Sequence, residues 1–340
     1  MTDPHVHLRD WNQSSKETVV HGMLTGAKAG FDIFFDMPNC NPPLTDRATI
    51  EKRILLGQKA EQELKEQGFD VHYHVYCGIT DNKDQIREMV RAYKELFPKV
   101  CGMKMFASQS TGNMGIIDSD AQKAVYRTLA EENYRGVLSV HCEKESLFRP
   151  YEPTHSLKRP PESEQASVRD QIRFAEDSGF KGTLHIAHIS CRGALDAIRE
   201  ARKRSIIRIT CGATPHHILL NTDNESAIVK MNPPLRDEEN RKAIWNALFD
   251  GTIDWIESDH APHTIEDKKN GASGLPGFEG MLLVIRKLIE AGMPQQRLTD
   301  LLCTNALRTF GIDEESKSVP VVSDEMIKQA RMAYPFSAWN

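Results

Sequence analysis

Residues Ser119–His141 read SDAQKAVYRTLAEENYRGVLSVH, and this stretch contains the repeating unit of the fold. The apolar residues of its first part recur three and four positions apart, which is helical spacing; they are Ala121, Ala124, Val125 and Leu129. Asp118 or Ser119 can cap the start of this helix. The last five residues, Val137–His141, form a short apolar run that is typical of a buried strand.

Short apolar runs followed by amphipathic stretches recur along the chain. The eight runs are Pro4–Leu8, Phe31–Asp36, Val71–Cys77, Cys101–Phe106, Val137–His141, Thr183–His188, Ile206–Cys211 and Ile253–Ser258. Strands that alternate with helices predict a parallel sheet, and the count of eight favours a closed barrel over an open doubly wound sheet. We therefore expect an α/β fold of the (β/α)8, or TIM-barrel, class over residues 1–312, followed by a C-terminal extension over residues 313–340.

The composition argues against several classes of partner. Lys and Arg total 43 and Asp and Glu total 48, so the formal net charge of −5 does not favour binding to nucleic acid. No apolar run approaches the roughly 20 residues of a membrane helix. Met1–His5 has neither the basic start nor the apolar core of a signal peptide. The seven cysteines are scattered, which is typical of reduced thiols, so we expect a cytoplasmic protein without a membrane partner.

Side chains that can bind a metal ion stand at the ends of five of the eight runs. They are His5 and His7 on the first run, Lys104 on the fourth, His141 on the fifth, His188 on the sixth, and Asp259 directly after the eighth. The carboxyl ends of barrel strands gather on one face, where barrel enzymes place their active sites. The sequence therefore predicts a metal centre on that face.

Two segments share the His-x-His spacing, in which both side chains point the same way from a strand and can reach one cation. The first, His5-Val6-His7, has the polar neighbours Asp3, Arg9 and Asp10. The second, His72-Tyr73-His74, lies within a β-rich run. We expect the first pair to bind metal and the second pair to be partly buried strand histidines.

Two further residues have more than one interpretation, and a third has one. If Lys104 points inward, burial lowers its pKa and makes available a neutral amine that can add CO2 to form a carbamate; if it points outward, it reaches water. Asp259 can bind metal and accept a proton from bound water, or it can cap a helix. His185 stands three residues before His188 and should face away from it, so we interpret His185 as structural.

At these residues the chain resembles the amidohydrolase superfamily, and within it the dihydroorotases, from about Asp3 to Ile312. The segments that carry the resemblance are Asp3–Asp10, Asp36–Pro43, Gly102–Phe106, His185–Ser190, Thr214–His217, Met231–Arg236, Ser258–His263 and Gly274–Glu279. Arg9, two residues after the second histidine, and the segment Met37-Pro38-Asn39 point to the dihydroorotases rather than to hydantoinases or allantoinases.

The resemblance implies a zinc-dependent cyclic amidohydrolase that interconverts dihydroorotate and N-carbamoyl-L-aspartate in pyrimidine biosynthesis. It implies two Zn²⁺ ions bridged by a carboxylated Lys104 and by a hydroxide, with Asp259 as the proton shuttle. The implied metal ligands are His5, His7, Lys104, His141, His188 and Asp259. The implied substrate contacts are Arg9, Asn39, Asn232, His263, Pro276 and Gly277. The alternatives are a hydantoinase-type or allantoinase-type enzyme and a non-catalytic scaffold that keeps the barrel.

The chain also departs from the pattern of these relatives. They usually carry strands before the first His-x-His motif, which form a small β-sandwich with C-terminal strands, whereas here the motif begins at His5 and Lys317–Asn340 does not resemble the closing strands. Ala306 stands where a proline is typical. We expect a small-molecule substrate with a carboxylate, and a homo-oligomer or a partner subunit. The segment Ala107–Gly115, rich in small polar residues, is either a lid or a plain surface loop.

Overall fold

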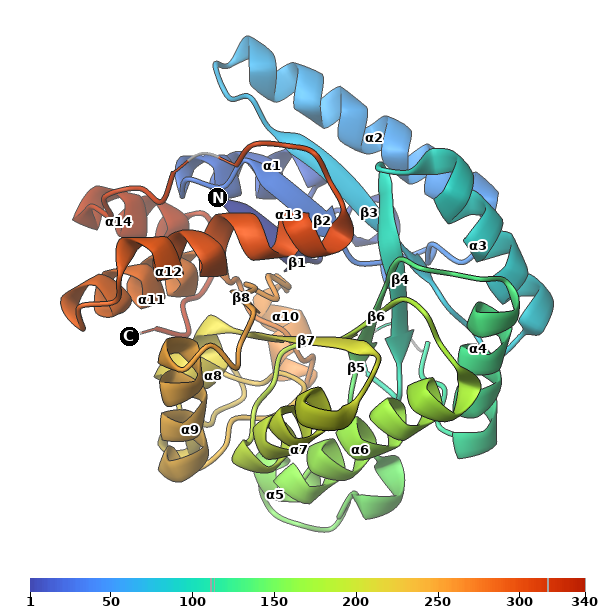
Figure 1. The fold of residues 1–340 in the computed structure, drawn as a ribbon. Helices are drawn as coiled ribbons and strands as arrows, with labels where there is room; N and C mark the ends of the chain where they lie inside the picture. Colours follow the sequence, from blue (N-terminus) through green and yellow to red (C-terminus); the bar gives the residue numbers. More distant parts are fainter. Residues whose placement is uncertain (111, 113, 317, 340) are drawn as a thin grey trace.

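The computed structural model describes residues 1–110, 112, 114–316 and 318–339, and its centre is one sheet of eight parallel strands (Figure 1). The strands are β1 Thr2–Val6, β2 Ile33–Asp36, β3 His72–Gly78, β4 Val100–Phe106, β5 Val137–His141, β6 Thr183–Ile186, β7 Arg208–Ala213 and β8 Trp255–Ile256. Each of them overlaps the apolar run that predicted it. They pair in sequence order from β1 to β8, which is the order of a barrel and not of an open doubly wound sheet.

The barrel is nearly closed by contacts between β1 and the segment that follows β8. Val6 forms a parallel bridge with His260, and the backbone nitrogen of His7 donates to the carbonyl of His260 at 2.7 Å. The backbone nitrogen of Ser258 donates to Asp3 Oδ1 at 3.1 Å. The seam between first and last strands therefore joins two of the segments that carry the predicted site.

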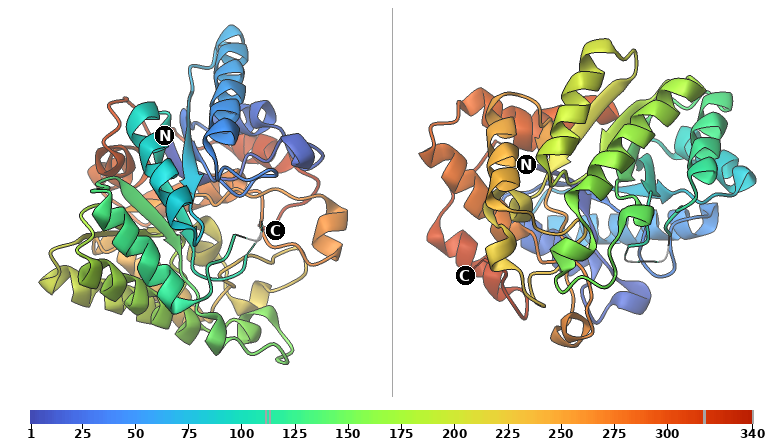
Figure 2. Two further views of the ribbon diagram at one scale, coloured as in Figure 1. Left: turned by 90° about the vertical axis from the view of Figure 1, so that its right-hand side faces the viewer. Right: turned by 90° about the horizontal axis from the view of Figure 1, so that it is seen from below.

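The helices form a layer around the strands, which the two further views confirm (Figure 2). They are α1 Val19–Lys28, α2 Arg47–Glu66, α3 Lys83–Leu96, α4 Ser119–Glu131, α5 His155–Lys158, α6 Pro161–Ser178, α7 Arg192–Arg204, α8 Pro215–Leu219, α9 Glu238–Phe249, α10 Ile265–Lys269, α11 Phe278–Glu290, α12 Gln295–Thr299, α13 Asn305–Phe310 and α14 Asp324–Met332. Asp118 caps α4, because its carboxylate accepts from the backbone nitrogen of Ala121 at 2.8 Å. Among the described residues, no helix combines the length and the apolar character that crossing a membrane requires.

Helix α13 packs in a buried cluster that includes the first residues of β2, β5 and β8, at the amino-terminal end of the barrel; these are Ile33, Val137 and Trp255. Phe310 meets the ring of Phe35 edge-on, with ring centroids 4.9 Å apart, and lies 5.8 Å from the ring of Tyr76. Ala306, which replaces the typical proline, is buried in the same cluster. The seven cysteines are buried and free of disulfides, as expected. Because α13 covers the amino-terminal end, the opposite end is left for the site.

The C-terminal segment lies against the barrel, where α14 packs on α1 and α11. Tyr334 follows α14, and its hydroxyl donates to Glu17 Oε1 at 2.6 Å. Glu17 Oε2 also lies 3.0 Å from His260 Nε2, so the same buried carboxylate contacts the residue that closes the barrel. The end of the chain is thus tied to the seam between β1 and the segment after β8.

We predict that Tyr334→Phe lowers the free energy of unfolding by about 1–3 kcal/mol, because the buried Glu17 carboxylate loses a donor. Urea unfolding of the two proteins measures the difference. Tyr151→Phe is the matched control: Tyr151 is 100% exposed, and its substitution should change the free energy by less than about 0.5 kcal/mol. Equal unfolding free energies for parent and Tyr334→Phe would contradict this role for the hydroxyl.

Candidate metal centre

The six predicted metal ligands converge at the carboxyl ends of the strands. His5 lies on β1, Lys104 on β4 and His141 at the end of β5. His7 directly follows β1, His188 lies two residues after the end of β6, and Asp259 lies three residues after the end of β8. All six side chains are buried. The four histidines and Asp259 line one cavity. The structure therefore brings together residues that lie up to 254 positions apart in the sequence.

Asp259 forms one group of possible ligands with the first histidine pair. Its Oδ1 lies 3.0 Å from His7 Nε2 and 3.4 Å from His5 Nε2. Burial alone would raise the pKa of Asp259, but the hydrogen bond from His7 and the charges of both histidines hold it below its usual range, so the carboxylate is ionised. The capping alternative is excluded, because the next helix, α10, is capped by Thr264.

The backbone of three site residues adopts the left-handed region, which non-glycine residues rarely occupy. The φ angles are 45° at Arg9, 41° at His188 and 47° at Asp259. In each case the residue lies in the turn that follows a strand. These turns direct the three side chains to the cavity, which all three line.

His141 and His188 form a second group. His141 Nδ1 and His188 Nε2 lie 3.3 Å apart, and the two ring centroids are 4.9 Å apart. His141 Nε2 donates to Glu143 Oε2 at 2.8 Å, so the proton stays on Nε2 and the lone pair of Nδ1 faces His188. His7 is also held at both nitrogens: its Nδ1 donates to Asn39 Oδ1 at 2.7 Å, and its Nε2 lies 3.0 Å from Asp259 Oδ1.

Lys104 points inward, which is the first of the two orientations that the sequence left open. Its side chain is fully buried, and among the described residues its Nζ has no hydrogen-bond partner. Burial lowers the pKa of Lys104 from 10.5 to about 8. Burial also lowers the pKa of His5, His7, His141 and His188, and the charge of Lys104 lowers each further, as expected for an amine among these four rings.

This set of donors fits divalent metal ions. Buried polar atoms normally have partners, yet within the described residues Lys104 Nζ and His188 Nδ1 have none. The ligand atoms of His5, His7 and Asp259 lie within 4.8 Å of one another. Imidazole nitrogens and a carboxylate are the ligands that Zn²⁺ takes in catalytic sites. The first group can hold one ion, and His141 with His188 can hold a second.

Two buried carboxylates that support the ligands escaped the sequence analysis. Glu143 accepts from His141, as described above, and Glu257 accepts from the backbone nitrogen of His188 and lies 3.6 Å from His5 Nδ1. Each stands two residues from a predicted ligand at the end of a strand, and this spacing was the signal that could have revealed them. Burial would raise the pKa of Glu257, but histidine contacts, His185 first, lower it well below its usual range.

The other two histidine predictions are confirmed. His185 Nε2 lies 3.2 Å from Glu257 Oε2, and its ring stacks on Trp255 with centroids 4.2 Å apart, so it is structural. On β3, His72 is partly exposed, whereas His74 is buried and its Nε2 lies 3.0 Å from Glu314 Oε2. Neither residue of that pair lines the cavity.

Arg9 lines the cavity, and hydrogen bonds to neighbouring residues fix both its side chain and its backbone. Its Nε donates to the carbonyl of Pro262 at 3.2 Å, and its own carbonyl accepts from Arg53 Nη1 at 2.8 Å. His263 Nε2 lies 3.1 Å from Arg9 Nη2 and 3.0 Å from the carbonyl of Ser273. His263 therefore contacts Arg9 without lining the cavity.

Of the four remaining residues predicted to contact the substrate, two line the cavity and two do not. Asn39 and Asn232 line the cavity, and Asn232 Nδ2 donates to Ser110 Oγ at 3.3 Å. Pro276 and Gly277 do not line it, and the backbone nitrogen of Gly277 donates to His260 Nδ1 at 3.0 Å. The neighbouring residues Ser273 and Gly274 line the cavity in their place.

The segment Ala107–Gly115 borders the same cavity. Ser110 is one of the lining residues, which shows that this part of the segment reaches the site. Positions 111 and 113 lie outside the described residues. The choice between a lid and a surface loop stays a prediction.

Comparison with known proteins relates the whole barrel to one family. No family model matches the chain. The chain is 32% identical over 339 residues to the dihydroorotase of Pyrococcus horikoshii, covering 97% of this chain and 71% of the relative. The dihydroorotase of Bacillus cereus (strain G9842) is 31% identical over 330 residues, covering 92% and 72%.

Solved structures show the same fold at lower identity. The L-hydantoinase (dihydropyrimidinase) from Arthrobacter aurescens superposes with a TM-score of 0.80 at 20% identity, covering 95% of this chain and 73% of the other. The dihydroorotase of Saccharomyces cerevisiae in complex with 5-fluoroorotic acid gives a TM-score of 0.74 at 19% identity, covering 93% and 85%. These structures confirm the TIM-barrel class.

We predict that the stability of the metal-free protein in CO2-depleted buffer rises with pH through the titration of Lys104. Below pH 8 both the folded and the unfolded chain hold the proton, whereas between pH 8 and 10.5 only the unfolded chain holds it. The free energy of unfolding should therefore rise across this window, by about 3 kcal/mol in all. Lys104→Met should lack this rise and should be more stable than the parent near neutral pH.

Urea unfolding of both proteins from neutral to alkaline pH measures the effect. Lys203→Met, at an exposed position, is the matched control and should keep the pH dependence of the parent. If Lys104→Met followed the parent at every pH, Lys104 would not be the buried ammonium that we describe.

Proposed function

Because this chain belongs to the dihydroorotase family, we propose that its centre catalyses the reversible hydrolysis of dihydroorotate to N-carbamoyl-L-aspartate, a step of pyrimidine biosynthesis. The observation that carries the proposal is the position of Arg9. Its buried guanidinium lines the same cavity as the four histidines and Asp259, so an anionic group and a cyclic amide can be held together.

Two zinc ions would complete this centre. His5, His7 and Asp259 would hold one, His141 and His188 would hold the other, and Lys104 as a carbamate would lie between them. When bound, the ions would lower the pKa of water from about 16 to about 7 and would polarise the carbonyl oxygen of the substrate.

The environment of Lys104 favours formation of the carbamate. Burial lowers its pKa and makes the neutral amine available. The amine nitrogen would form a bond to the carbon of CO2 and release a proton, which converts the lysine into a carboxylate. That carboxylate would place a negative charge among four imidazoles, where the ammonium form lacks hydrogen-bond partners within the described part of the chain.

Asp259 is the group that would carry the proton. It is ionised, it lines the cavity, and its Oδ1 lies 3.4 Å from His5 Nε2 and 3.0 Å from His7 Nε2. We propose that it takes a proton from the attacking water and delivers it to the ring nitrogen that leaves the carbonyl carbon. In the reverse direction the same carboxylate would remove the proton from that nitrogen.

Arg9 would determine the choice of substrate. A planar guanidinium matches the two oxygens of a carboxylate. A neutral hydantoin or allantoin would leave it buried and unpaired, which costs binding energy. Asn39 and Asn232 would contact the substrate from the cavity wall, and His263 would support Arg9 from behind.

The test is ring opening of dihydroorotate by the purified, zinc-loaded protein, with hydantoin and allantoin in parallel. We expect turnover of dihydroorotate alone, and none by Asp259→Asn at an unchanged unfolding midpoint. Turnover of a neutral ring would instead indicate a hydantoinase-type or allantoinase-type enzyme. Zinc binding without turnover of any of the three rings would indicate a non-catalytic scaffold.

We also predict that Arg9→Ala raises the KM for dihydroorotate by about 10- to 100-fold, since charge-assisted hydrogen bonds to the carboxylate are lost. The effect on kcat should be smaller. Arg149→Ala, at a partly exposed site on the surface, should leave both constants at the values of the parent. An unchanged KM in Arg9→Ala would remove Arg9 from substrate recognition.

A further inference from the structure

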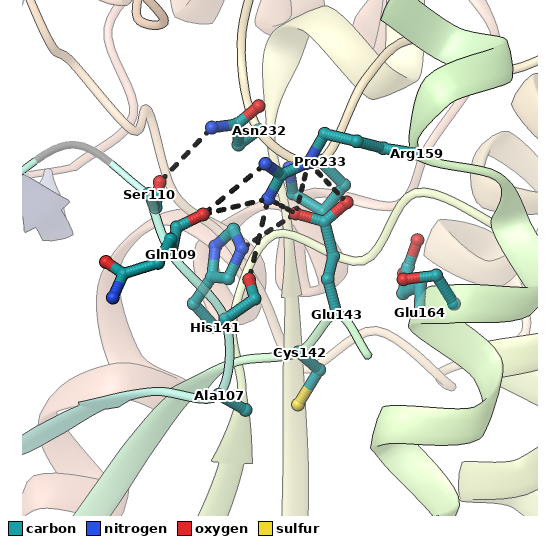
Figure 3. A network of polar contacts seen from close by, with 12 residues as sticks. Ala107, Gln109, Ser110, His141, Cys142, Glu143, Arg159, Glu164, Asn232 and Pro233 are labelled. Carbon is teal, nitrogen blue, oxygen red and sulfur yellow. Dashed lines mark hydrogen bonds and ion pairs between the residues drawn. The ribbon is translucent and has the colours of Figure 1, made fainter. Parts of the chain in front are cut away.

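Arg159 lies between a predicted metal ligand and the mouth of the cavity, and the chemistry proposed above does not use it. It follows α5, and its side chain is only 13% exposed. Its guanidinium packs on the ring of Phe148 at 4.4 Å. Figure 3 shows the guanidinium between Glu143 on one side and Gln109 on the other.

On the side that faces Glu143, Arg159 donates hydrogen bonds to the carboxylate that orients His141. Its Nε donates to Glu143 Oε1 at 3.0 Å and to Oε2 at 3.1 Å, and its Nη2 also donates to Oε2. Glu143 Oε2 is the atom that accepts from His141 Nε2. Because Glu143 is fully buried, Arg159 supplies the positive charge that this carboxylate needs in a medium of low polarity.

On its outer side, Arg159 holds the backbone at the mouth of the cavity. Its Nη1 and Nη2 donate to the carbonyl of Gln109 at 3.4 and 3.3 Å, and its Nη2 donates to Ser108 Oγ at 3.5 Å. The next residue, Ser110, lines the cavity and accepts from Asn232. One guanidinium therefore contacts both the support of a ligand and a segment of the cavity wall.

The backbone of Arg159 is fixed as well. Its carbonyl accepts from Arg236 Nη1, and Arg236 Nε donates to Ser190 Oγ at 2.9 Å. Ser190 stands two residues after His188. Arg159 is thus connected through Arg236 to the segment that carries the second ligand of the same group.

We propose that Arg159 is a positioning residue that fixes the His141 imidazole for the second metal ion and holds residues 108–110 at the cavity mouth. Without Arg159, Glu143 would be a buried carboxylate without its counter-charge. The carboxylate would then leave its present position, and the orientation of His141 would be lost with it. This inference adds a positioning residue to the function proposed above, and it rests on that proposal because it assumes that the centre binds two metal ions.

The test is a titration of the metal-free protein with Zn²⁺ against a competing chelator, with bicarbonate present. The parent should bind two ions. In Arg159→Met the affinity for one of them should fall by about 10- to 100-fold, the range typical of lost support to a histidine ligand, while the affinity for the other is kept. Hydrogen exchange of the backbone amides of residues 107–110 should become faster in the same variant.

Arg173→Met is the matched control for this change. Arg173 on α6 also pairs with a carboxylate, Asp170, at 2.8 Å, and also lies over a phenylalanine ring, that of Phe174, at 5.3 Å. It is 60% exposed and outside the cavity lining. Its substitution should change neither the zinc affinities nor the exchange at residues 107–110.

Three outcomes would overturn the proposal: a parent that binds a single ion, parent-like zinc affinities in Arg159→Met, or an equal loss in Arg173→Met. If Arg159→Met does not fold, Arg159→Lys decides, since it keeps the charge but lacks the planar fork. Arg159→Lys should exchange faster than the parent at residues 107–110 and should bind one zinc ion more weakly than the parent; parent-like values for both would contradict the proposal. Neither measurement needs a substrate, so absence of dihydroorotate turnover would count against the function and not against Arg159.

Discussion

The closure of the barrel between β1 and the segment after β8 is the constraint on which the site depends. β8 has only two residues, so the hydrogen bond from His7 to the carbonyl of His260 and the contact of Ser258 with Asp3 carry much of the closure. Both contacts lie beside ligand positions. The same hydrogen bonds that complete the sheet therefore place His5 and His7 opposite Asp259.

Around this seam the protein buries several ionisable groups. Glu143 accepts a hydrogen bond from the outer nitrogen of His141, Glu257 lies 3.6 Å from His5 Nδ1, and His141 Nδ1 faces His188 Nε2. Lys104 is the exception, because burial opposes its charge and no carboxylate lies within hydrogen-bonding distance of it among the described residues. The donor set of this candidate centre fits divalent cations.

Much of this could be predicted from the sequence, because apolar runs mark strands and ligands at strand ends share one face of a barrel. All eight strands were found in this way, and the six predicted ligand residues come together in the structure. The turns after the strands were not predictable, since Ser273 and Gly274 reach the cavity where Pro276 and Gly277 were expected to. Glu143 and Glu257 were missed because carboxylates that support ligands have no motif of their own; only the folded register shows what they face.

The left-handed turns at Arg9, His188 and Asp259 have a consequence for the evolution of this chain. Each such residue costs of the order of 1 kcal/mol relative to a relaxed backbone, and glycine would relieve that cost at all three positions. Selection for thermal stability alone would therefore act against three side chains of the candidate centre. Directed evolution for thermal stability, without a screen for activity, should lose residues at these three turns before it loses residues of the barrel core.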